Sequence, residues 1–486
     1  MEHTPFSFGR MARWFAVAFI LLWLGLGVWH SIMPLPEGLD YSGPPRAGIQ
    51  AEFLADLTWV DPAGQRRTDH RIFDRKLAMI RGAERLIVAD MFLFNDFAGD
   101  PDGADLRPLS AELTEALVSQ KRERPDLRII FITDPINTLY GGVDSMHLDA
   151  LSEAGIEVII TRLEPLRDSN PFWSGLWRIC CRWAGNSSHG GWLPNPVGEK
   201  KVGLRTWLRL ANFKANHRKT LVVDSGENWL GLVSSANPHD ASSAHGNVAV
   251  MVDGQAALDL LTTERAIAAF SAPSLAWPAV EWDGPADPSG RGLEARVLSE
   301  AAIRNAVVAE LNRADDRSRV DLAMFYLSHR DIVQALIRAQ QRGAFVRVLL
   351  DPNEHAFGRQ KGGVPNRSVA SELYRHGIPV RWCHTTGEQC HSKLIRLQHS
   401  ASDQVMIAGS ANFTRRNLDN LNPETNVLIR GRADDQALAE AADWFEQRWS
   451  NANGRSFSLA YPDYADERRW RYWQYRLMEA TGLSTF

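Results

Sequence analysis

Two short segments of the sequence carry side chains suited to chemistry at a phosphodiester. One residue separates His217 from Lys219, and one residue separates His391 from Lys393. Residues i and i+2 of an extended strand point to the same face, so each histidine and its lysine can line one surface. One imidazole can attack phosphorus while the other protonates the leaving oxygen, and two ammonium groups can neutralise the non-bridging oxygens.

Hydroxyl and amide side chains follow each histidine–lysine pair and can donate further hydrogen bonds to phosphate oxygens. These residues are Ser235, Asn237, Ser410 and Asn412. A metal site is the main alternative for two histidines. The sequence has no His-Glu-x-x-His segment, and a lysine beside each histidine would repel a cation. We therefore expect neither a metal nor another cofactor.

The two pairs occupy equivalent places in an internal duplication. Residues 85–95 and 318–328 are similar apolar runs that contain Met-Phe, with helix-like patterns before and after them. A second apolar run then ends in Asp-Pro, at Pro135 in the first copy and at Pro352 in the second. Strands that alternate with helices predict an α/β fold with parallel strands and helices on both faces, and we expect the two copies to pack face to face.

The duplication divides the chain into five predicted segments. The length of 486 residues suffices for two large domains, and an apolar content of 44% excludes a disordered chain. The segments are residues 1–36 (a stub and an apolar anchor), 50–270 (the first α/β domain, with a Trp-rich insertion at 163–212), 271–292 (a Pro- and Gly-rich linker), 293–450 (the second α/β domain) and 451–486 (an aromatic and basic C-terminal segment).

The duplicated pattern resembles the phospholipase D superfamily, in which HxKxxxxD is followed by GSxN. The first motif is complete from His217 through Lys219 to Asp224. The second motif departs from the pattern, because Gln398 stands where an aspartate is expected and Asp403 lies further along. The family's aspartate is thought to act structurally, so the resemblance implies that the second motif still functions.

The resemblance also implies roles for individual side chains. It implies a covalent phosphohistidine, no metal, and acceptance of either water or an alcohol. By analogy His217 is the nucleophile and His391 the general acid, although the reverse order stays open. Glu424 resembles the acidic residue that orients a catalytic histidine in this family, and a carboxylate there would stabilise an imidazolium. The matching place in the first copy, residues 245–247, has no acid.

The N-terminal segment predicts a membrane anchor. Residues 14–36 contain no Asp, Glu, Lys or Arg, and about 20 apolar residues suffice for a helix to cross a bilayer. Because Arg10 and Arg13 precede this segment, the positive-inside tendency puts the N-terminus in the cytoplasm and the catalytic body on the other side of the membrane. A cleaved signal peptide is the alternative, but residues 30–34 make a poor cleavage site.

A body outside the cytoplasm permits disulfides, and spacing alone does not decide between paired and free thiols. The four cysteines are Cys180, Cys181, Cys383 and Cys390. The chain also has 17 tryptophans, and the insertion and the C-terminal segment place several of them beside arginines. This composition suits the headgroup layer of a membrane with anionic lipid. Helices packed on the domain, or a rim around the site, would explain the same pattern.

Together these features favour a membrane-anchored phosphodiesterase or phosphatidyltransferase, similar to cardiolipin synthases, with a phospholipid as substrate. Because one chain supplies both motifs, we expect a monomeric active unit. A membrane-anchored nuclease and a non-catalytic binding protein stay open as alternatives. A formal net charge of −4 and the lack of a long basic run disfavour nucleic acid as a partner. The headgroup, and the choice between hydrolysis and transfer, also stay open.

Overall fold

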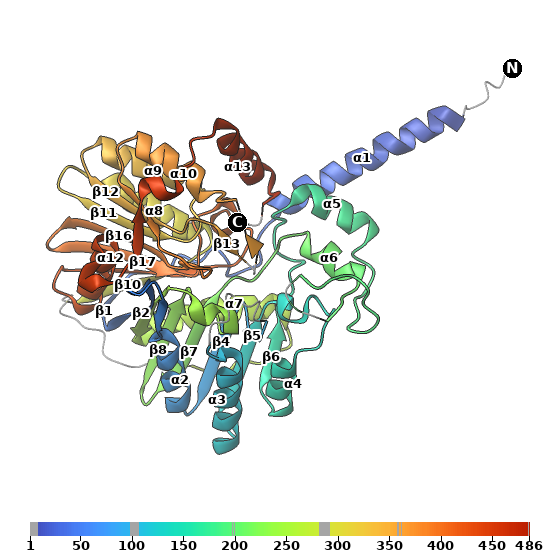
Figure 1. The fold of residues 1–486 in the computed structure, drawn as a ribbon. Helices are drawn as coiled ribbons and strands as arrows, with labels where there is room; N and C mark the ends of the chain where they lie inside the picture. Colours follow the sequence, from blue (N-terminus) through green and yellow to red (C-terminus); the bar gives the residue numbers. More distant parts are fainter. Residues whose placement is uncertain are drawn as a thin grey trace.

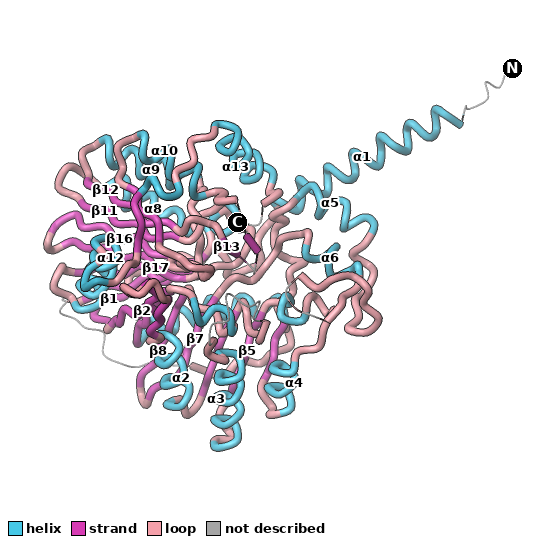
Figure 2. The backbone as a smooth tube through the Cα atoms, viewed as in Figure 1, coloured by secondary structure: helices cyan, strands magenta, loops and turns pink. Residues whose placement is uncertain are grey.

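Two β-sheets face each other in the computed structural model, with helices on their outer sides (Figure 1, Figure 2). The structure describes residues 8–97, 106–196, 198, 200–280, 292–356, 359–360, 362–484 and 486. Residues 281–291, which make up half of the predicted linker, lie outside the described residues.

The first sheet has eight strands and is only partly parallel. In spatial order the strands are β3 (Arg66–Asp69), β2 (Ala51–Val60), β9 (Asn247–Asp253), β8 (Asn228–Ser234), β7 (Lys219–Ser225), β4 (Leu86–Met91), β5 (Arg128–Thr133) and β6 (Glu157–Ile160). The prediction of parallel strands is correct for β4, β5 and β6. It is wrong for the other strands, which pair antiparallel. Between β7 and β8 the short turn requires this direction.

The second sheet repeats this arrangement. In spatial order its strands are β1 (Arg46–Ile49), β10 (Leu293–Ser299), β18 (Thr425–Gly431), β17 (Asp403–Gly409), β16 (Lys393–Ser400), β11 (Arg319–Met324), β12 (Phe345–Leu350), β15 (Val380–Cys383) and β19 (Ser458–Ala460). The strands from β10 to β15 match those from β2 to β6 in order and direction. The duplication in the sequence is therefore a duplication of the fold. A separate hairpin consists of β13 (His355–Ala356) and β14 (Arg359–Gln360).

Helices cover the outer faces and join the two halves. The outer helices are α2 (Ile72–Gly82), α3 (Leu109–Glu123) and α4 (Met146–Glu153) in the first half, and α8 (Ala301–Arg313), α9 (Arg330–Gln341) and α10 (Asn366–Arg375) in the second. The others are α1 (Phe8–Ile32), α5 (Pro171–Cys180), α6 (Leu204–Leu210), α7 (Gly254–Ser271), α11 (Arg415–Leu418), α12 (Gln436–Ser450) and α13 (Arg469–Thr481). Short 3-10 turns are η1 (Pro135–Thr138), η2 (Asp240–Ala244), η3 (Ala452–Gly454) and η4 (Tyr461–Tyr464).

A single apolar core is shared by the inner faces of the two sheets. Strands β8 and β9 lie against β16, β17 and β18. The core takes Phe53 and Val88 from the first sheet, and Ala323 and Leu394 from the second. Helix α7 reaches across to β10, and α12 reaches across to β2. Burial of this shared apolar surface fixes the two halves relative to each other.

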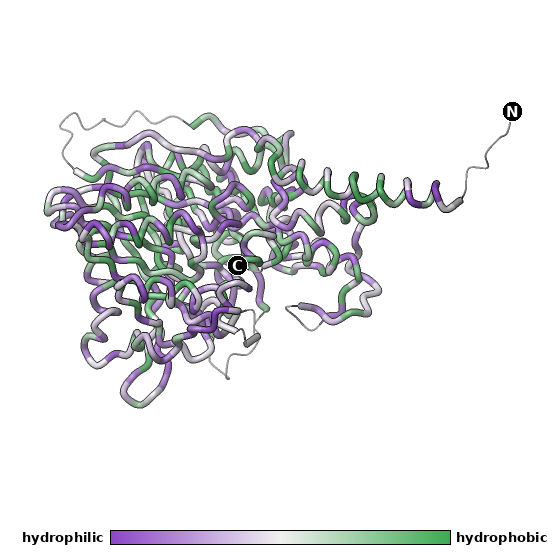
Figure 3. Tube along the Cα trace, turned by 90° about the horizontal axis from the view of Figure 1, so that it is seen from above, coloured by the Kyte–Doolittle hydropathy of each residue, from purple (hydrophilic) through white to green (hydrophobic). Residues whose placement is uncertain are grey.

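One helix in the described part of the chain, Gly9–Ile32, is long and apolar enough to cross a membrane. Helix α1 projects from the body (Figure 1), and hydrophobic residues occupy most of its length (Figure 3). Only 6% of its most apolar window is buried in the protein, so it is not a core helix.

Candidate active site

The two motif histidines lie at matching places, each held by the other half of the protein. Each precedes its strand, β7 or β16, by two residues. The backbone N–H of His217 donates to the carbonyl of Pro423 at 3.0 Å. The backbone N–H of His391 donates to the carbonyl of Gly246 at 2.8 Å. Both anchors cross the interface between the duplicated halves.

The imidazoles are oriented across the same interface. Nδ1 of His217 lies 2.6 Å from Oε1 of Glu424, and Nδ1 of His391 lies 3.2 Å from Oδ1 of Asn247. Glu424 directly precedes β18, and Asn247 begins the matching strand β9. A carboxylate from the second half therefore orients the first histidine, and a neutral amide from the first half orients the second. Both contacts leave Nε2 of each ring available for a substrate.

Serine side chains support these orienting residues. The Ser410 hydroxyl donates to Glu424, and the Ser235 hydroxyl donates to Oδ1 of Asn247 at 3.0 Å. The Asn417 amide also donates to Glu424. The sequence suggested both serines as phosphate donors, but here their hydroxyl hydrogens are used within the protein.

The two asparagines of the motifs differ from each other. Oδ1 of Asn237 accepts a hydrogen bond from the backbone N–H of Leu93 at 3.4 Å. Oδ1 of Asn412 is buried and accepts no hydrogen bond from the residues that the structure describes.

Each motif lysine extends back toward its own histidine. The Lys219 ammonium donates to the carbonyl of His217 at 2.6 Å, and the Lys393 ammonium donates to that of His391 at 2.9 Å. Each ammonium also lies near an aromatic ring that contacts the histidine. The ammonium-to-centroid distances are 4.8 Å for Phe92 in the first half and 5.1 Å for Phe325 in the second.

The histidines and lysines of both halves share one electrostatic environment. The pKa of His217 is lowered to about 4, mainly by burial; Lys219 and Lys393 contribute to this shift, and Glu424 opposes it. Burial and the charge of Lys393 lower the pKa of His391 well below its usual value, with contributions from Lys219 and His217. Burial also lowers the pKa of Lys219 to about 7. Each histidine is therefore influenced by the lysines of both motifs, and the two motifs meet in a single buried site.

Binding of an anion to this site is expected to be coupled to the uptake of protons by the protein. Added negative charge raises the pKa values of the histidines and lysines, so the complex holds more protons than the free protein. Affinity for sulfate, which does not itself titrate near neutral pH, should therefore fall as pH rises from 6 to 8. Calorimetry in two buffers of different ionisation enthalpy measures the proton uptake. A Lys393→Met variant should take up fewer protons, and equal uptake would contradict this account.

Asp224 lies near the far end of β7 from His217 and has no contact with the site. Its carboxylate accepts hydrogen bonds from the backbone N–H groups of Glu84, Arg85 and Leu86, at 3.1, 2.9 and 2.8 Å. These bonds fix the chain where β4 begins. This contact is structural.

The second half closes the matching turn in another way. Gln398 pairs with Arg319 in the sheet. The turn before β11 is closed by Asp315, whose carboxylate accepts from the backbone N–H of Arg317 at 3.1 Å and from the Ser318 hydroxyl at 3.0 Å. Asp403 pairs with Arg313 and Arg430, away from the histidines. The missing aspartate therefore leaves the geometry of the second motif intact.

Replacement of Asp224 by alanine is expected to lower the free energy of unfolding by about 3 kcal/mol, because it leaves one buried and two partly buried N–H groups without their acceptor. The matched variant Gln398→Ala should change it by less than about 0.5 kcal/mol. Thermal denaturation of the detergent-solubilised protein measures both. Equal melting temperatures for the two variants would refute the structural role of Asp224.

The sequence analysis missed two aspartates that hold the residues before the histidines. Oδ2 of Asp134 accepts from the backbone N–H of Asn216 at 2.7 Å, and Oδ2 of Asp351 accepts from that of Cys390 at 2.8 Å. Burial raises the pKa of both carboxyl groups to about 7. The sequence feature that could have revealed these aspartates is the Asp-Pro pair, which occurs in both copies and was interpreted only as the end of a strand.

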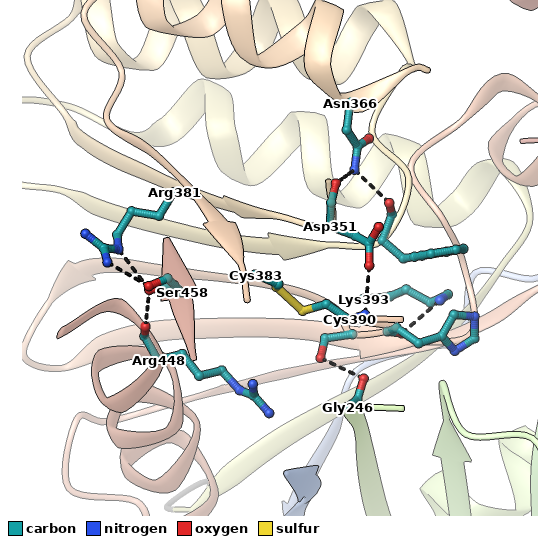
Figure 4. The surroundings of a disulfide bond; sticks show 12 residues. Gly246, Asp351, Asn366, Arg381, Cys383, Cys390, Lys393, Arg448 and Ser458 are labelled. Carbon is teal, nitrogen blue, oxygen red and sulfur yellow. Dashed lines mark hydrogen bonds between the residues drawn. A yellow bond between two sulfur atoms is a disulfide. The ribbon is translucent and has the colours of Figure 1, made fainter. Parts of the chain in front are cut away.

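A disulfide lies directly beside the second motif (Figure 4). Cys383, at the end of β15, is bonded to Cys390, which precedes His391. Asn366 supports the same region by donating to the backbone carbonyl of Asp351 at 2.8 Å. Cys180 and Cys181 form a second disulfide, so the structure answers the question that the spacing of the cysteines left open.

A buried ion pair beneath the site ties its parts together. Nη2 of Arg218 donates to Oε1 of Glu300 at 2.7 Å, and the backbone N–H of Glu424 donates to the same oxygen at 3.2 Å. The other carboxylate oxygen accepts from the backbone N–H of Asp40, in the segment that follows α1, at 2.8 Å. Glu300 therefore links the first motif, the orienting carboxylate and the segment that leads out of the apolar helix.

The charges of the site suit an anion. Among the residues that the structure describes, no group of three or more His, Cys, Asp or Glu could hold a metal ion. Two ammonium groups, two imidazoles and one carboxylate can instead bind a phosphodiester, attack it and protonate its leaving group.

The two halves form a duplicated α/β fold that brings the two histidine–lysine pairs together, and this arrangement resembles the phospholipase D superfamily. Residues 307–449 match the family model described as the PLD-like domain of cardiolipin synthase. The phosphatidylserine synthase of Haemophilus influenzae Rd KW20 has a similar structure, with a TM-score of 0.53 at 10% identity over 90% of this chain and 94% of that one. The resemblance to the superfamily and the predicted fold class are confirmed.

Two further structures are similar at lower scores and carry no weight for the fold. One is Nuc, a phospholipase D family member from Salmonella typhimurium, with a TM-score of 0.28, 20% identity, and coverage of 33% of this chain and 95% of that one. The other is the polyphosphate kinase of Porphyromonas gingivalis, with a TM-score of 0.45, 13% identity, and coverage of 89% of this chain and 53% of that one. No curated protein sequence matches the chain.

Proposed function

We propose that this protein is a membrane-anchored, phospholipase D-like phosphodiesterase or phosphatidyltransferase that acts on phospholipids. The observation that carries the proposal is the meeting of His217 and His391, each with a lysine, in one buried site. The cardiolipin synthase family model and the fold shared with a phosphatidylserine synthase support a phospholipid substrate. Helix α1 supports the anchor, and Arg10 and Arg13 favour a cytoplasmic N-terminus with the body on the other side.

The proposed reaction has two steps. Nε2 of His217 attacks phosphorus, the bond from phosphorus to the leaving alcohol breaks, and the alcohol oxygen takes a proton from His391. Water or a second alcohol then gives its proton to His391 and attacks the phosphohistidine, which frees Nε2 of His217. Glu424 stabilises the positive ring of the intermediate, and Lys219 and Lys393 neutralise the phosphate oxygens.

Glu424 favours His217 as the nucleophile. The ring gains positive charge when Nε2 bonds to phosphorus, and a carboxylate at Nδ1 stabilises that charge. His391, next to the neutral Asn247, has no such stabilisation and gives up its proton more readily. A bound phosphodiester offsets the charge of the lysines and so raises the pKa of His391, which lets the ring be protonated at the start of the reaction.

The test uses the full chain in vesicles that contain labelled phosphatidylglycerol and phosphatidylethanolamine, with products identified by mass. Phosphatidic acid is the expected product of hydrolysis, and an exchanged lipid is expected when an alcohol is added. Absence of both products would overturn the proposal. Cleavage of short DNA without lipid turnover would instead assign the same chemistry to a nuclease.

A further inference from the structure

Helix α5, in the Trp-rich insertion, packs closely against the last third of α1. The indole N–H of Trp23 donates to the carbonyl of Phe172 at 2.7 Å, and the centroids of the two rings are 4.5 Å apart. A Cβ atom on Gly27 would lie 2.6 Å from the carbonyl oxygen of Pro171, and one on Gly175 would lie 2.6 Å from that of Trp23. Only glycine allows the two backbones to approach so closely. Small residues at a helix crossing are typical of helix pairs within membranes.

The contact lies well inside the apolar length of α1. The charge-free stretch begins at Trp14, directly after Arg13. At 1.5 Å per residue, Trp23 lies about 14 Å and Gly27 about 20 Å beyond Trp14. The hydrocarbon layer of a bilayer is about 30 Å thick. If α1 crosses the membrane along its apolar length, its contact with α5 extends from the middle of the hydrocarbon layer toward the catalytic body.

The exposed faces of both helices support this position. On the turns of α1 that also carry the contact with α5, Val28, Trp29 and Ile32 are exposed to 60%, 58% and 65%. Phe172 on α5 is exposed to 55%. Apolar side chains of this size on consecutive helical turns fit lipid better than water. Lipid that surrounds α1 at this level also surrounds the adjoining face of α5.

The base of the insertion is built for surroundings of low polarity and is coupled to the active site. Arg178 of α5 donates to both carboxylate oxygens of Asp168, at 3.0 and 2.9 Å, and the Lys214 ammonium donates to the same carboxylate at 2.8 Å. All three side chains are buried. Lys214 is followed three residues later by His217. This paired cluster avoids the cost of isolated buried charge and links α5 to the segment that leads into the first motif.

We propose that α1 and α5 together form a two-helix membrane seat, in which α5 is immersed in the half of the bilayer nearer to the catalytic body. The inference deepens the proposed function and rests on its membrane anchor. The guanidinium of Arg182 lies 4.1 Å from the centroid of the exposed Trp183, a pair that suits anionic headgroups at the surface of that layer. The seat brings the active site to the level of the phosphodiesters, so that a lipid need not leave the bilayer to react.

A depth measurement tests the seat. Nitroxide labels are attached to Phe172→Cys and, as a control, to Met146→Cys, which lies on α4 and is 70% exposed. Both full-length proteins are placed in vesicles of phosphatidylglycerol and phosphatidylethanolamine. The label at position 172 should respond to dissolved oxygen but not to a water-soluble nickel chelate, and the label at 146 should show the reverse. Equal access of the nickel chelate to both labels would overturn the seat.

Lipid turnover by the same labelled proteins separates this inference from the proposed function. If the protein turns over lipids but the label at position 172 is exposed to water, the membrane seat is overturned and the proposed function is not. Release of the protein from the vesicles by alkaline carbonate overturns the anchor, and the seat with it.

A matched pair of glycine variants gives a second test. Gly27→Leu should force α5 away from α1, whereas a Cβ atom at Gly25 meets nothing within 4 Å, so Gly25→Leu should be tolerated. We expect Gly27→Leu to lower turnover of vesicle lipids about tenfold and to leave turnover of short-chain, water-soluble phosphatidylglycerol unchanged. Gly25→Leu should match the unaltered protein on both substrates. Equal turnover of vesicle lipids by the two variants would overturn the seat.

Discussion

The variant His391→Asn is expected to stop turnover of phospholipids, with a fall in kcat of at least about 10³-fold, and to leave the fold intact. The fold should survive because the backbone N–H of His391, which donates to Gly246, is unchanged. Asparagine cannot supply a proton to the leaving alcohol or take one from water. With a substrate whose leaving group needs no proton, the first step should still proceed, so a phosphohistidine should accumulate on His217. Mass spectrometry of the quenched protein detects it.

The variant His217→Asn is the control for the assignment of roles. It should be equally inactive but should form no phosphohistidine with the activated substrate, because the nucleophile is missing. Accumulation of the intermediate in His217→Asn, and not in His391→Asn, would reverse the two roles. Near-normal turnover in His391→Asn would show that the second motif has no part in the reaction.

The second large effect is expected from Glu424→Gln, which should lower kcat about 10²-fold. Glutamine retains the shape of the side chain but removes the charge that stabilises the positive ring of His217. A hydrogen bond to a charged group contributes about 1.5–3 kcal/mol, which corresponds to a factor of roughly 10 to 150 in rate. Steady-state turnover of vesicle lipids at pH 7 measures the loss.

The matching variant on the other side of the site is Asn247→Ala. It removes a neutral hydrogen bond at His391, so we expect a loss of only about tenfold. A larger loss in Asn247→Ala than in Glu424→Gln would contradict the assignment of the carboxylate to the nucleophile.

Much of the fold could be predicted from the sequence because its signals are local. Runs of apolar residues fix where strands and helices lie, and the same order of runs occurs twice. The apolar helix before Met33 is also a local signal, since composition alone decides whether a helix can cross a bilayer. Strand direction was predicted correctly only where a helix lies between two consecutive strands. The apolar runs of β7 and β8 look like those of the parallel strands, and only the short turn between them makes the pair antiparallel.

The residue types of the candidate site were also visible, but several of their contacts were not. The sequence placed His217, Lys219, His391 and Lys393 in one cleft because the two pairs occupy equivalent places in the duplication. It did not show that the serines after each motif contact the orienting residues. Nor did it show that Asp315 closes, in the second half, the turn that matches the one closed by Asp224 in the first half. These contacts depend on how loops fold over strand ends, and no periodic pattern records that.

The sequence by itself determined the two histidine–lysine pairs, the duplicated scaffold and the apolar helix. Only the tertiary structure decided that the halves exchange their orienting residues, Glu424 to His217 and Asn247 to His391. These partners are 207 and 144 residues apart in the chain. They meet because the two sheets bury one common apolar surface, and that burial, rather than any local pattern, sets which strand ends come together.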